Sequence, residues 1–118
     1  MINYTLYSKP LSITMNVITN NQSFCVAAAT KVLGDRWTPK ILVALINGEK
    51  HYTEIAHEVT GISPRSLSHR LSSLVKNGVL IKKTNNTRNI TYTLTKMGKD
   101  LYPILVDMVE WGKKYRPN

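Results

Sequence analysis

The apolar residues of segment 61–78 repeat with the spacing of an α-helix. One stripe is apolar and consists of Leu67, Leu71, Leu74 and Val75. The opposite face is polar or basic and consists of Arg65, Ser66, His69, Ser72, Ser73 and Lys76. Ser63 suits the N-cap, Pro64 the first helical position, and Asn77 with Gly78 the C-terminal stop. The pattern predicts an amphipathic helix whose exposed face attracts anions.

Three more helices are predicted upstream from the same kinds of signal. The first covers residues 24–33, and the second covers residues 38–46 and is apolar on most faces, which places it in the core. Residues 49–51 are expected to be a short link, and a third helix follows with Thr53 as its cap. Only residues 61–63 separate this third helix from the amphipathic one. Two short helices joined so closely predict a helix-turn-helix.

The periodicity changes after the amphipathic helix. Residues 79–81 and 90–94 are rich in strand-forming side chains, and the Asn-rich segment 85–89 lies between them. This pattern predicts a β-hairpin. The turn end of the hairpin is basic and carries Lys82, Lys83 and Arg88. A basic hairpin directly after a helix-turn-helix is typical of the wing of a winged helix.

The last predicted element is one long helix from Thr95 to Tyr115, bent at Pro103. Its apolar stripe is wider than the rest of a domain of this size would cover. We expect the helix to pack against a second copy of the chain in a homodimer. The interface residues are then Leu101, Ile104, Leu105, Met108 and Trp111. The alternative is a helix folded back over its own core.

The first 22 residues are set apart as an N-terminal arm, and residues 23–116 as the winged-helix domain. Positions 11–17 alternate between apolar and polar side chains. This alternation favours a strand or an extended arm that packs on a partner subunit. The alternative is a partly ordered tail. The predicted fold class is mainly α with a small β-hairpin (α+β).

Charge indicates the class of partner. The chain of 118 residues has a formal net charge of +9. No acidic residue lies between Gly61 and Lys99, a span that contains eight of the 16 lysines and arginines. A basic block of this kind is typical of a surface that faces nucleic-acid phosphates. The alternative is a solvated face that serves solubility.

Other functional classes find less support in the sequence. It contains no Gly-rich phosphate loop and no arrangement of a nucleophile with a base, so neither an enzyme nor a cofactor is predicted. The longest apolar run, residues 41–46, is too short to span a bilayer, and no membrane partner is expected. Cys25 is the single cysteine, which excludes an intramolecular disulfide and favours the cytoplasm.

Four segments of the chain resemble HxlR-type winged helix-turn-helix regulators. The matching motifs are GDRWT at 34–38, ISPRSLSHRL at 62–71, YTLTKMG at 92–98, and PIL with EWG between 103 and 112. The resemblance covers about residues 25–115. It implies a cytoplasmic, homodimeric transcription regulator of MarR-like architecture that dimerises through its first and last helices. The turn at 85–89 is shorter than the wing common in that family and contains no proline.

The resemblance also raises a question about Cys25. Many relatives carry a cysteine before the first helix that senses electrophiles or oxidants, although one or two residues further from the Gly-x-x-Trp motif. A reactive thiol usually has a cation or a histidine beside it. Cys25 has neither as a neighbour in the sequence. Two interpretations stay open: a buried structural cysteine, and a sensor that forms a mixed disulfide, an adduct or an intersubunit bond. The effector is not identified.

Double-stranded DNA is therefore the expected partner. Residues expected near phosphates are Thr38, Lys40, Tyr52, Ser63, Arg70 and Lys76, together with Lys82, Lys83 and Arg88 of the wing. Residues expected at base edges in the major groove are Arg65, Ser66, Ser68 and His69. A twofold pair of such helices implies an inverted-repeat operator with half-sites about one helical turn apart.

The alternative function is a metal-sensing or protein-interaction module without specific DNA binding. Glu54 and His57 have the Glu-x-x-His spacing that places both side chains on one helix face. With Cys25 or His51 they would suffice for a single metal ion. A solvated helix face is the more favoured interpretation of this motif, and no metal site is predicted.

Overall fold

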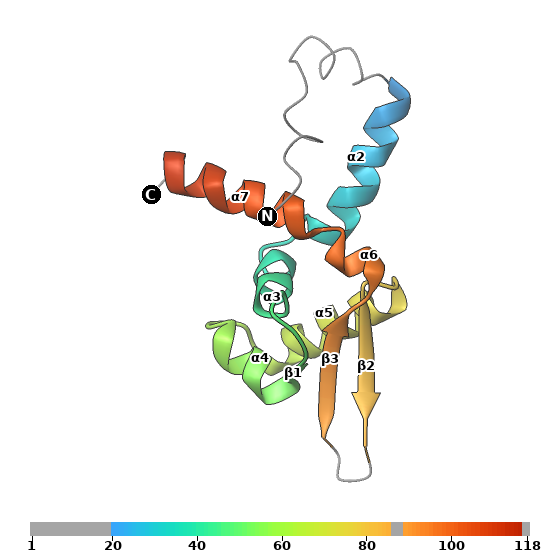
Figure 1. The fold of residues 1–118 in the computed structure, drawn as a ribbon, viewed down its shortest axis with the longest axis vertical. Coiled ribbons are helices and arrows are strands. Elements are labelled where there is room, and N and C mark those ends of the chain that lie inside the picture. Colours follow the sequence, from blue (N-terminus) through green and yellow to red (C-terminus); the bar gives the residue numbers. More distant parts are fainter. Residues whose placement is uncertain (1–19, 86–88, 117–118) are drawn as a thin grey trace. The chain divides into compact units, whose positions relative to one another are not determined.

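The computed structural model describes residues 20–85 and 89–116. The chain divides into two compact units, Met1–Asp35 and Arg36–Asn118 (Figure 1). The first unit contains helix α2 (Asn20–Leu33), which starts before the predicted residue 24 because no glycine or proline interrupts residues 20–23. Residues 23–31 of α2 are exposed, and Phe24 is 75% exposed. The strand or extended arm predicted at positions 11–17 lies outside the described residues.

The second unit combines helices with a three-stranded antiparallel sheet. Its elements are α3 (Thr38–Ala44), β1 (Lys50–His51), α4 (Tyr52–Glu58), α5 (Pro64–Lys76), β2 (Leu80–Thr84), β3 (Ile90–Leu94), α6 (Lys96–Lys99) and α7 (Tyr102–Tyr115). The strand order is β1-β3-β2, so the hairpin β2–β3 meets β1 along β3 (Figure 1). A mostly helical unit with a small sheet confirms the predicted fold class.

The core of the second unit is formed by the helices that precede the hairpin and by the inner face of the hairpin. Ile41 and Leu42 of α3 and Ile55 of α4 are completely buried. In the hairpin, Leu80 pairs with Leu94, and both side chains are buried. The burial of Ile41 and Leu42 confirms that the second predicted helix lies in the core.

The prediction of a link at residues 49–51 is wrong for the last two of these residues, because they form strand β1. Lys50 pairs with Tyr92 and His51 pairs with Thr91. The backbone polar groups along this edge of β3 need partners, and β1 supplies them. A strand of two residues has no periodicity, so only the tertiary structure reveals it.

The start of α4 also differs from the prediction. The N-cap is His51 rather than Thr53, and the carboxylate of Glu54 accepts a hydrogen bond of 2.8 Å from the His51 backbone N–H. Glu54 thereby satisfies a donor at the cap and places a negative charge at the positive end of the helix. The cap therefore lies two residues earlier than predicted.

The predicted long C-terminal helix is in fact two helices. Thr95 caps α6 as predicted, and its Oγ1 accepts a hydrogen bond of 3.1 Å from the Gly98 N–H. However, α6 ends at Lys99, and Pro103 lies in the first turn of α7. Proline has no N–H to donate to the carbonyl of Lys99 and its ring would clash there, whereas a first turn accommodates it. The helix therefore restarts instead of bending.

Leu105 corrects one part of the predicted dimer interface. This side chain is 3% exposed, so it belongs to the core of its own unit and is not available to a second copy. The first turns of α7 thus follow the alternative prediction, a helix folded over its own core. The later residues Met108 and Trp111 remain exposed.

Candidate nucleic-acid interface

Helix α5 begins and ends where the sequence predicts. The Ser63 Oγ accepts a hydrogen bond of 3.1 Å from the Ser66 backbone N–H, and Pro64 occupies the first turn. Gly78 follows the C-cap residue with a φ of +81°, a conformation that glycine adopts without strain. The caps fix where the helix starts and therefore which side chains point away from the core. The Ser63 hydroxyl, predicted near a phosphate, has this capping role in the structure.

The exposed side chains of α5 form one polar and basic surface, which we call the α5 outer face. It consists of Arg65, Ser68, His69, Ser72 and Lys76. Ser66 and Arg70 lie at its borders and are partly exposed. The helix contains no acidic residue, so nothing on α5 itself neutralises Arg65 or Lys76. This surface has the charge and the short side chains that suit close approach to a nucleic acid.

Tyr52 joins α4 to α5. Its phenolic hydroxyl lies 3.3 Å from the backbone carbonyl oxygen of Pro64 and 3.2 Å from the Ser68 Oγ. The sequence places Tyr52 near a phosphate, whereas the structure directs its hydroxyl to α5. The partners lie 12 and 16 residues away along the chain, so no local pattern reveals this contact.

The start of α3 corrects one of the predicted phosphate contacts and shows two basic side chains beside Trp37. Thr38 is 2% exposed, so its side chain is part of the core and does not reach a phosphate. Lys40 is exposed, and its ammonium lies 5.2 Å from the centroid of the Trp37 ring. The Arg36 guanidinium lies 4.5 Å from the same centroid. Arg36 is not among the site residues predicted from the sequence, although it directly precedes Trp37 in the chain.

The two lysines of the wing point to opposite faces of the hairpin. Consecutive side chains of a strand alternate, so Lys82 shares a face with its partner Tyr92, and Lys83 shares the other face with Thr91. Tyr92 is buried and β2 packs against α5, so Lys82 lies on the face of the hairpin that is turned to α5. Arg88, predicted in the turn of the hairpin, lies outside the described residues.

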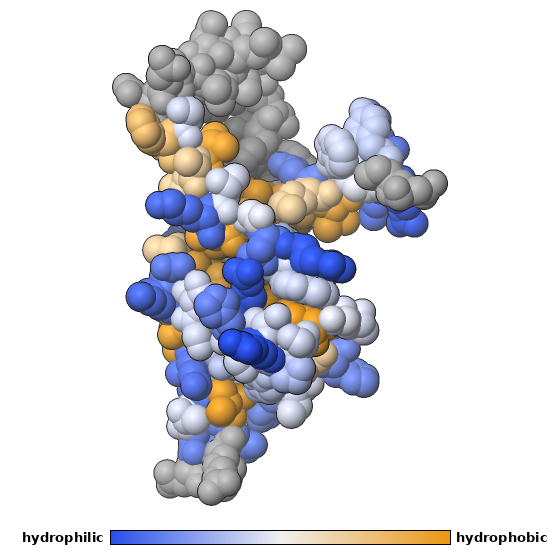
Figure 2. All heavy atoms as spheres, turned by 180° about the vertical axis from the view of Figure 1, so that it is seen from behind, coloured by the Kyte–Doolittle hydropathy of each residue, from blue (hydrophilic) through white to orange (hydrophobic). Residues whose placement is uncertain are grey.

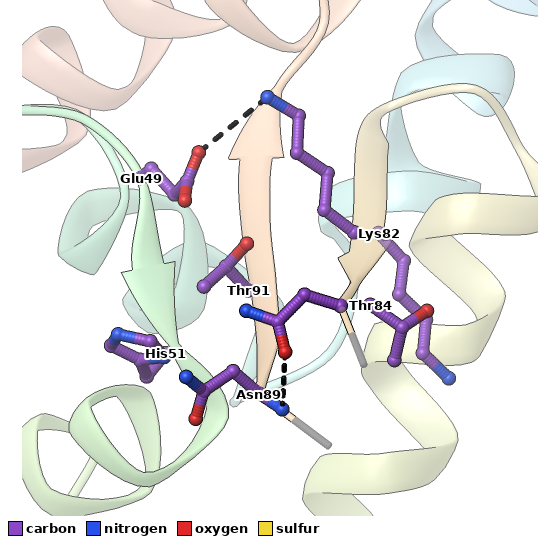
Figure 3. A pocket seen from close by; sticks show the side chains of 8 residues that line it. Glu49, His51, Lys82, Thr84, Asn89 and Thr91 are labelled. Atoms are coloured by element: carbon purple, nitrogen blue, oxygen red, sulfur yellow. Dashed lines mark hydrogen bonds and ion pairs between the residues drawn. The ribbon is translucent and has the colours of Figure 1, made fainter. Parts of the chain in front are cut away.

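The other face of the sheet is hollowed (Figure 3). The hollow has a volume of about 670 Å³. Its lining includes Glu49, His51, Lys83, Asn89 and Thr91, and the β2 residues Lys82 and Thr84 also line it. The Lys83 ammonium lies 3.7 Å from a carboxylate oxygen of Glu49. Glu49 therefore partly neutralises the charge of Lys83, which makes Lys83 a weaker candidate for a phosphate contact.

Two shifted pKa values reflect the contacts around β1. A hydrogen bond to Glu58 raises the pKa of Lys50 against the opposing effect of burial, and their charged atoms lie 2.9 Å apart. Burial raises the pKa of Tyr92, and the neighbouring Tyr52 adds to this effect. The Lys50 charge thus ties β1 to the end of α4 instead of facing DNA.

The structure also bears on the alternatives. Within residues 20–85 and 89–116, no three His, Cys, Asp or Glu side chains come together as metal ligands, and Glu54 with His57 lines an open surface hollow. None of the helices in this part of the chain is both long and apolar enough to cross a membrane. Cys25 is exposed, which contradicts the interpretation as a buried structural cysteine.

Comparisons with known proteins agree with this geometry. The sequence profile of the family described as HxlR-like helix-turn-helix matches residues 32–118. The HTH-type transcriptional regulator YvaP of Bacillus subtilis is 34% identical over 89 residues, which are 74% of this chain and 82% of YvaP.

Solved structures are similar as well. The redox regulator HypR in its oxidised form has a TM-score of 0.74 and 27% identity, over 79% of this chain and 98% of HypR. The quinone-bound YodB of B. subtilis has a TM-score of 0.66 and 29% identity, over 75% of this chain and 96% of YodB. The neighbours therefore share a winged-helix fold and include regulators that respond to redox chemistry.

Proposed function

The chain belongs to the HxlR-like helix-turn-helix family of DNA-binding transcriptional regulators, and from this premise we propose that it acts as a homodimer on an inverted-repeat operator. The observation that carries the proposal is the α5 outer face. Arg65 and Lys76 lie on one exposed surface of α5, and this helix contains no acidic residue. Lys82 of the wing lies on the face of the hairpin that is turned to α5. The proposed compartment is the cytoplasm.

Arg65 is the principal base-reading residue in this proposal. It is exposed in the first turn of α5, the part of a recognition helix that reaches deepest into the major groove. Its guanidinium suits the O6 and N7 acceptors of guanine. Ser66, Ser68 and His69 lie beside Arg65 and are assigned to base edges as well. The residues assigned to phosphates are Arg70, Lys76, Ser63, Lys40 and Lys82.

Unburied apolar side chains support the homodimer. In α7 the exposed residues include Met108, Val109 and Trp111, of which Trp111 is 60% exposed. Figure 2 shows hydrophobic surface in orange on the arm at the upper right, which is α7. Met108 and Val109 also line a groove of about 450 Å³ together with Val43. In the first unit, α2 exposes Phe24 and Val26. Apolar surface of this extent is typical of an interface, and we assign Leu101, Ile104, Met108 and Trp111 to it.

The proposal is tested by measuring DNA affinity as a function of salt. Fluorescence anisotropy with a duplex from upstream of the protein's own gene is expected to give a dissociation constant about a thousandfold lower than a random duplex of equal length. The logarithm of the affinity should fall linearly with the logarithm of the salt concentration, because bound phosphates release counterions.

Equal affinity for both duplexes at every salt concentration would contradict sequence-specific binding. That result would favour the alternative, a winged-helix module for protein interaction or metal sensing. Analytical ultracentrifugation of the same samples checks the stoichiometry, which should be two chains for each operator. A single chain on each operator would refute the homodimer.

A response to oxidants or electrophiles is a second proposal, carried by the exposure of Cys25 on α2. Its support from the comparisons is that HypR is named a redox regulator and that YodB has been solved with a bound quinone. Since Cys25 is the only cysteine of the chain, a disulfide formed on oxidation must join it to a second copy or to a small thiol.

Treatment with the thiol oxidant diamide is expected to change operator affinity by roughly 5- to 150-fold, the usual range for coupling between two sites. The Cys25→Ser variant should bind the operator equally well with and without diamide. Intact mass spectrometry and a non-reducing gel identify the product. An unchanged mass of the wild-type chain after treatment would eliminate this proposal.

A further inference from the structure

The Tyr52 hydroxyl makes two contacts with α5, and together they determine where its proton lies. Tyr52 is the first residue of α4, and Pro64 and Ser68 are one helical turn apart on α5. The hydroxyl donates to the Pro64 carbonyl oxygen at 3.3 Å and contacts the Ser68 Oγ at 3.2 Å. The tyrosine therefore bridges the two helices of the helix-turn-helix at the N-terminal end of the recognition helix.

The chemistry of the three groups assigns a direction to each hydrogen bond. A carbonyl oxygen only accepts, so the single phenolic proton of Tyr52 goes to Pro64. In the contact with Ser68, the Tyr52 oxygen must then accept, and the Ser68 hydroxyl must donate its own single proton. The proton of Ser68 is thus directed towards α4. What the Ser68 Oγ can still offer to a ligand is an acceptor lone pair.

Ser68 also lies on the surface of α5 that is proposed to face the bases. It is exposed and stands three positions after Arg65, a spacing that puts both side chains on one side of the helix. In the major groove, adenine N6 and cytosine N4 are donors, whereas thymine O4 and guanine O6 and N7 are acceptors. An oxygen without a free proton discriminates between these two classes.

We propose that Tyr52 is a positioning residue that holds Ser68 as a hydrogen-bond acceptor, so that Ser68 selects a base that presents an amino group in the major groove, adenine or cytosine, at one operator position. This inference rests on the proposed function, because it assumes that α5 enters the major groove. It reassigns Tyr52 from a phosphate contact to a residue that acts on DNA only through Ser68.

The test compares base preferences of matched variants. The half-site is first defined by selection from a random duplex pool, and each position is then changed to all four bases. Affinities are measured for the wild type, Tyr52→Phe, Ser68→Ala and the double variant. Tyr102→Phe is the control, since it deletes an exposed phenolic hydroxyl at the start of α7, away from Tyr52 and Ser68 in the sequence.

The wild type is expected to prefer adenine or cytosine over guanine and thymine by about tenfold at one position. The Tyr52→Phe variant frees the Ser68 proton to rotate, so Ser68 can either donate or accept, and the preference there should fall to about twofold or less. Affinity for the preferred base should change by less than about threefold. Ser68→Ala should lose the same preference, and Tyr52→Phe should add nothing to this loss in the double variant. The control variant Tyr102→Phe should keep the wild-type profile.

The contrary outcomes are distinct. If Tyr52→Phe weakens binding to all sequences alike, or leaves the wild-type preference intact, Tyr52 is only a brace between the helices and the inference is wrong. A preference for guanine or thymine that depends on Ser68 also overturns it. If the wild type has no base preference at all, the proposed function itself fails, and the inference fails with it.

Discussion

Replacing Leu71 with alanine should lower the free energy of unfolding by about 2–5 kcal/mol. Leu71 is completely buried at the middle of α5, between the buried residues Leu67 and Leu74 of the same helix. Truncation removes apolar contacts and leaves a cavity that its neighbours fill only in part. Urea denaturation followed by circular dichroism measures the change. A domain of this size has little stability in reserve, so specific DNA binding should weaken as well.

Ser72→Ala is the matched control on the same helix. Ser72 is exposed and next to Leu71, so its replacement should change the free energy of unfolding by no more than about 0.5 kcal/mol. The buried stripe of α5 would be wrongly identified if the two variants lost equal stability. A Leu71→Ala variant as stable as the wild type would have the same meaning.

Replacing Arg65 with alanine should cost about 1–3 kcal/mol of binding free energy for the operator and relax preference at one base position. Arg65 is exposed in the first turn of α5, so the fold should be unaffected. Anisotropy titrations with the operator and with single-base variants measure both effects. The protein's melting temperature serves as the check on folding.

Lys82→Ala is the control for Arg65→Ala. Lys82 lies on the α5 side of the hairpin and is expected to contact a phosphate, so its loss should weaken all sequences alike and reduce the salt slope by about 1. The assignment of Arg65 to a base edge would be untenable if the two variants reduced specific and random binding in the same proportion.

The predictable parts of this structure are those determined by neighbouring residues. Ser63 and Pro64 start α5, and the recurring leucines define its buried side, because capping and helical periodicity act within a few positions. Thr95 likewise caps α6 as predicted. These local signals were sufficient to predict the recognition helix and the hairpin that follows it.

The parts that escaped prediction depend on residues far apart in sequence. The strand at Lys50 and His51 exists because β3 lies beside it, and Thr38 is buried because the core closes over it. The hydroxyl of Tyr52 finds its partners only once α4 and α5 pack together. The break before α7 is a different kind of error, because Pro103 was recognised but expected to bend a helix that instead restarts.

Strand β1 has a consequence for protein engineering. It ends at His51 and α4 begins at Tyr52, so the sheet continues directly into the helix-turn-helix. The ion pair between Lys50 and Glu58 connects the other end of α4 to the same strand. The helix-turn-helix is therefore not a module that can be transplanted by itself. A chimaera meant to inherit the DNA preference of this protein would have to take the three strands together with the two helices.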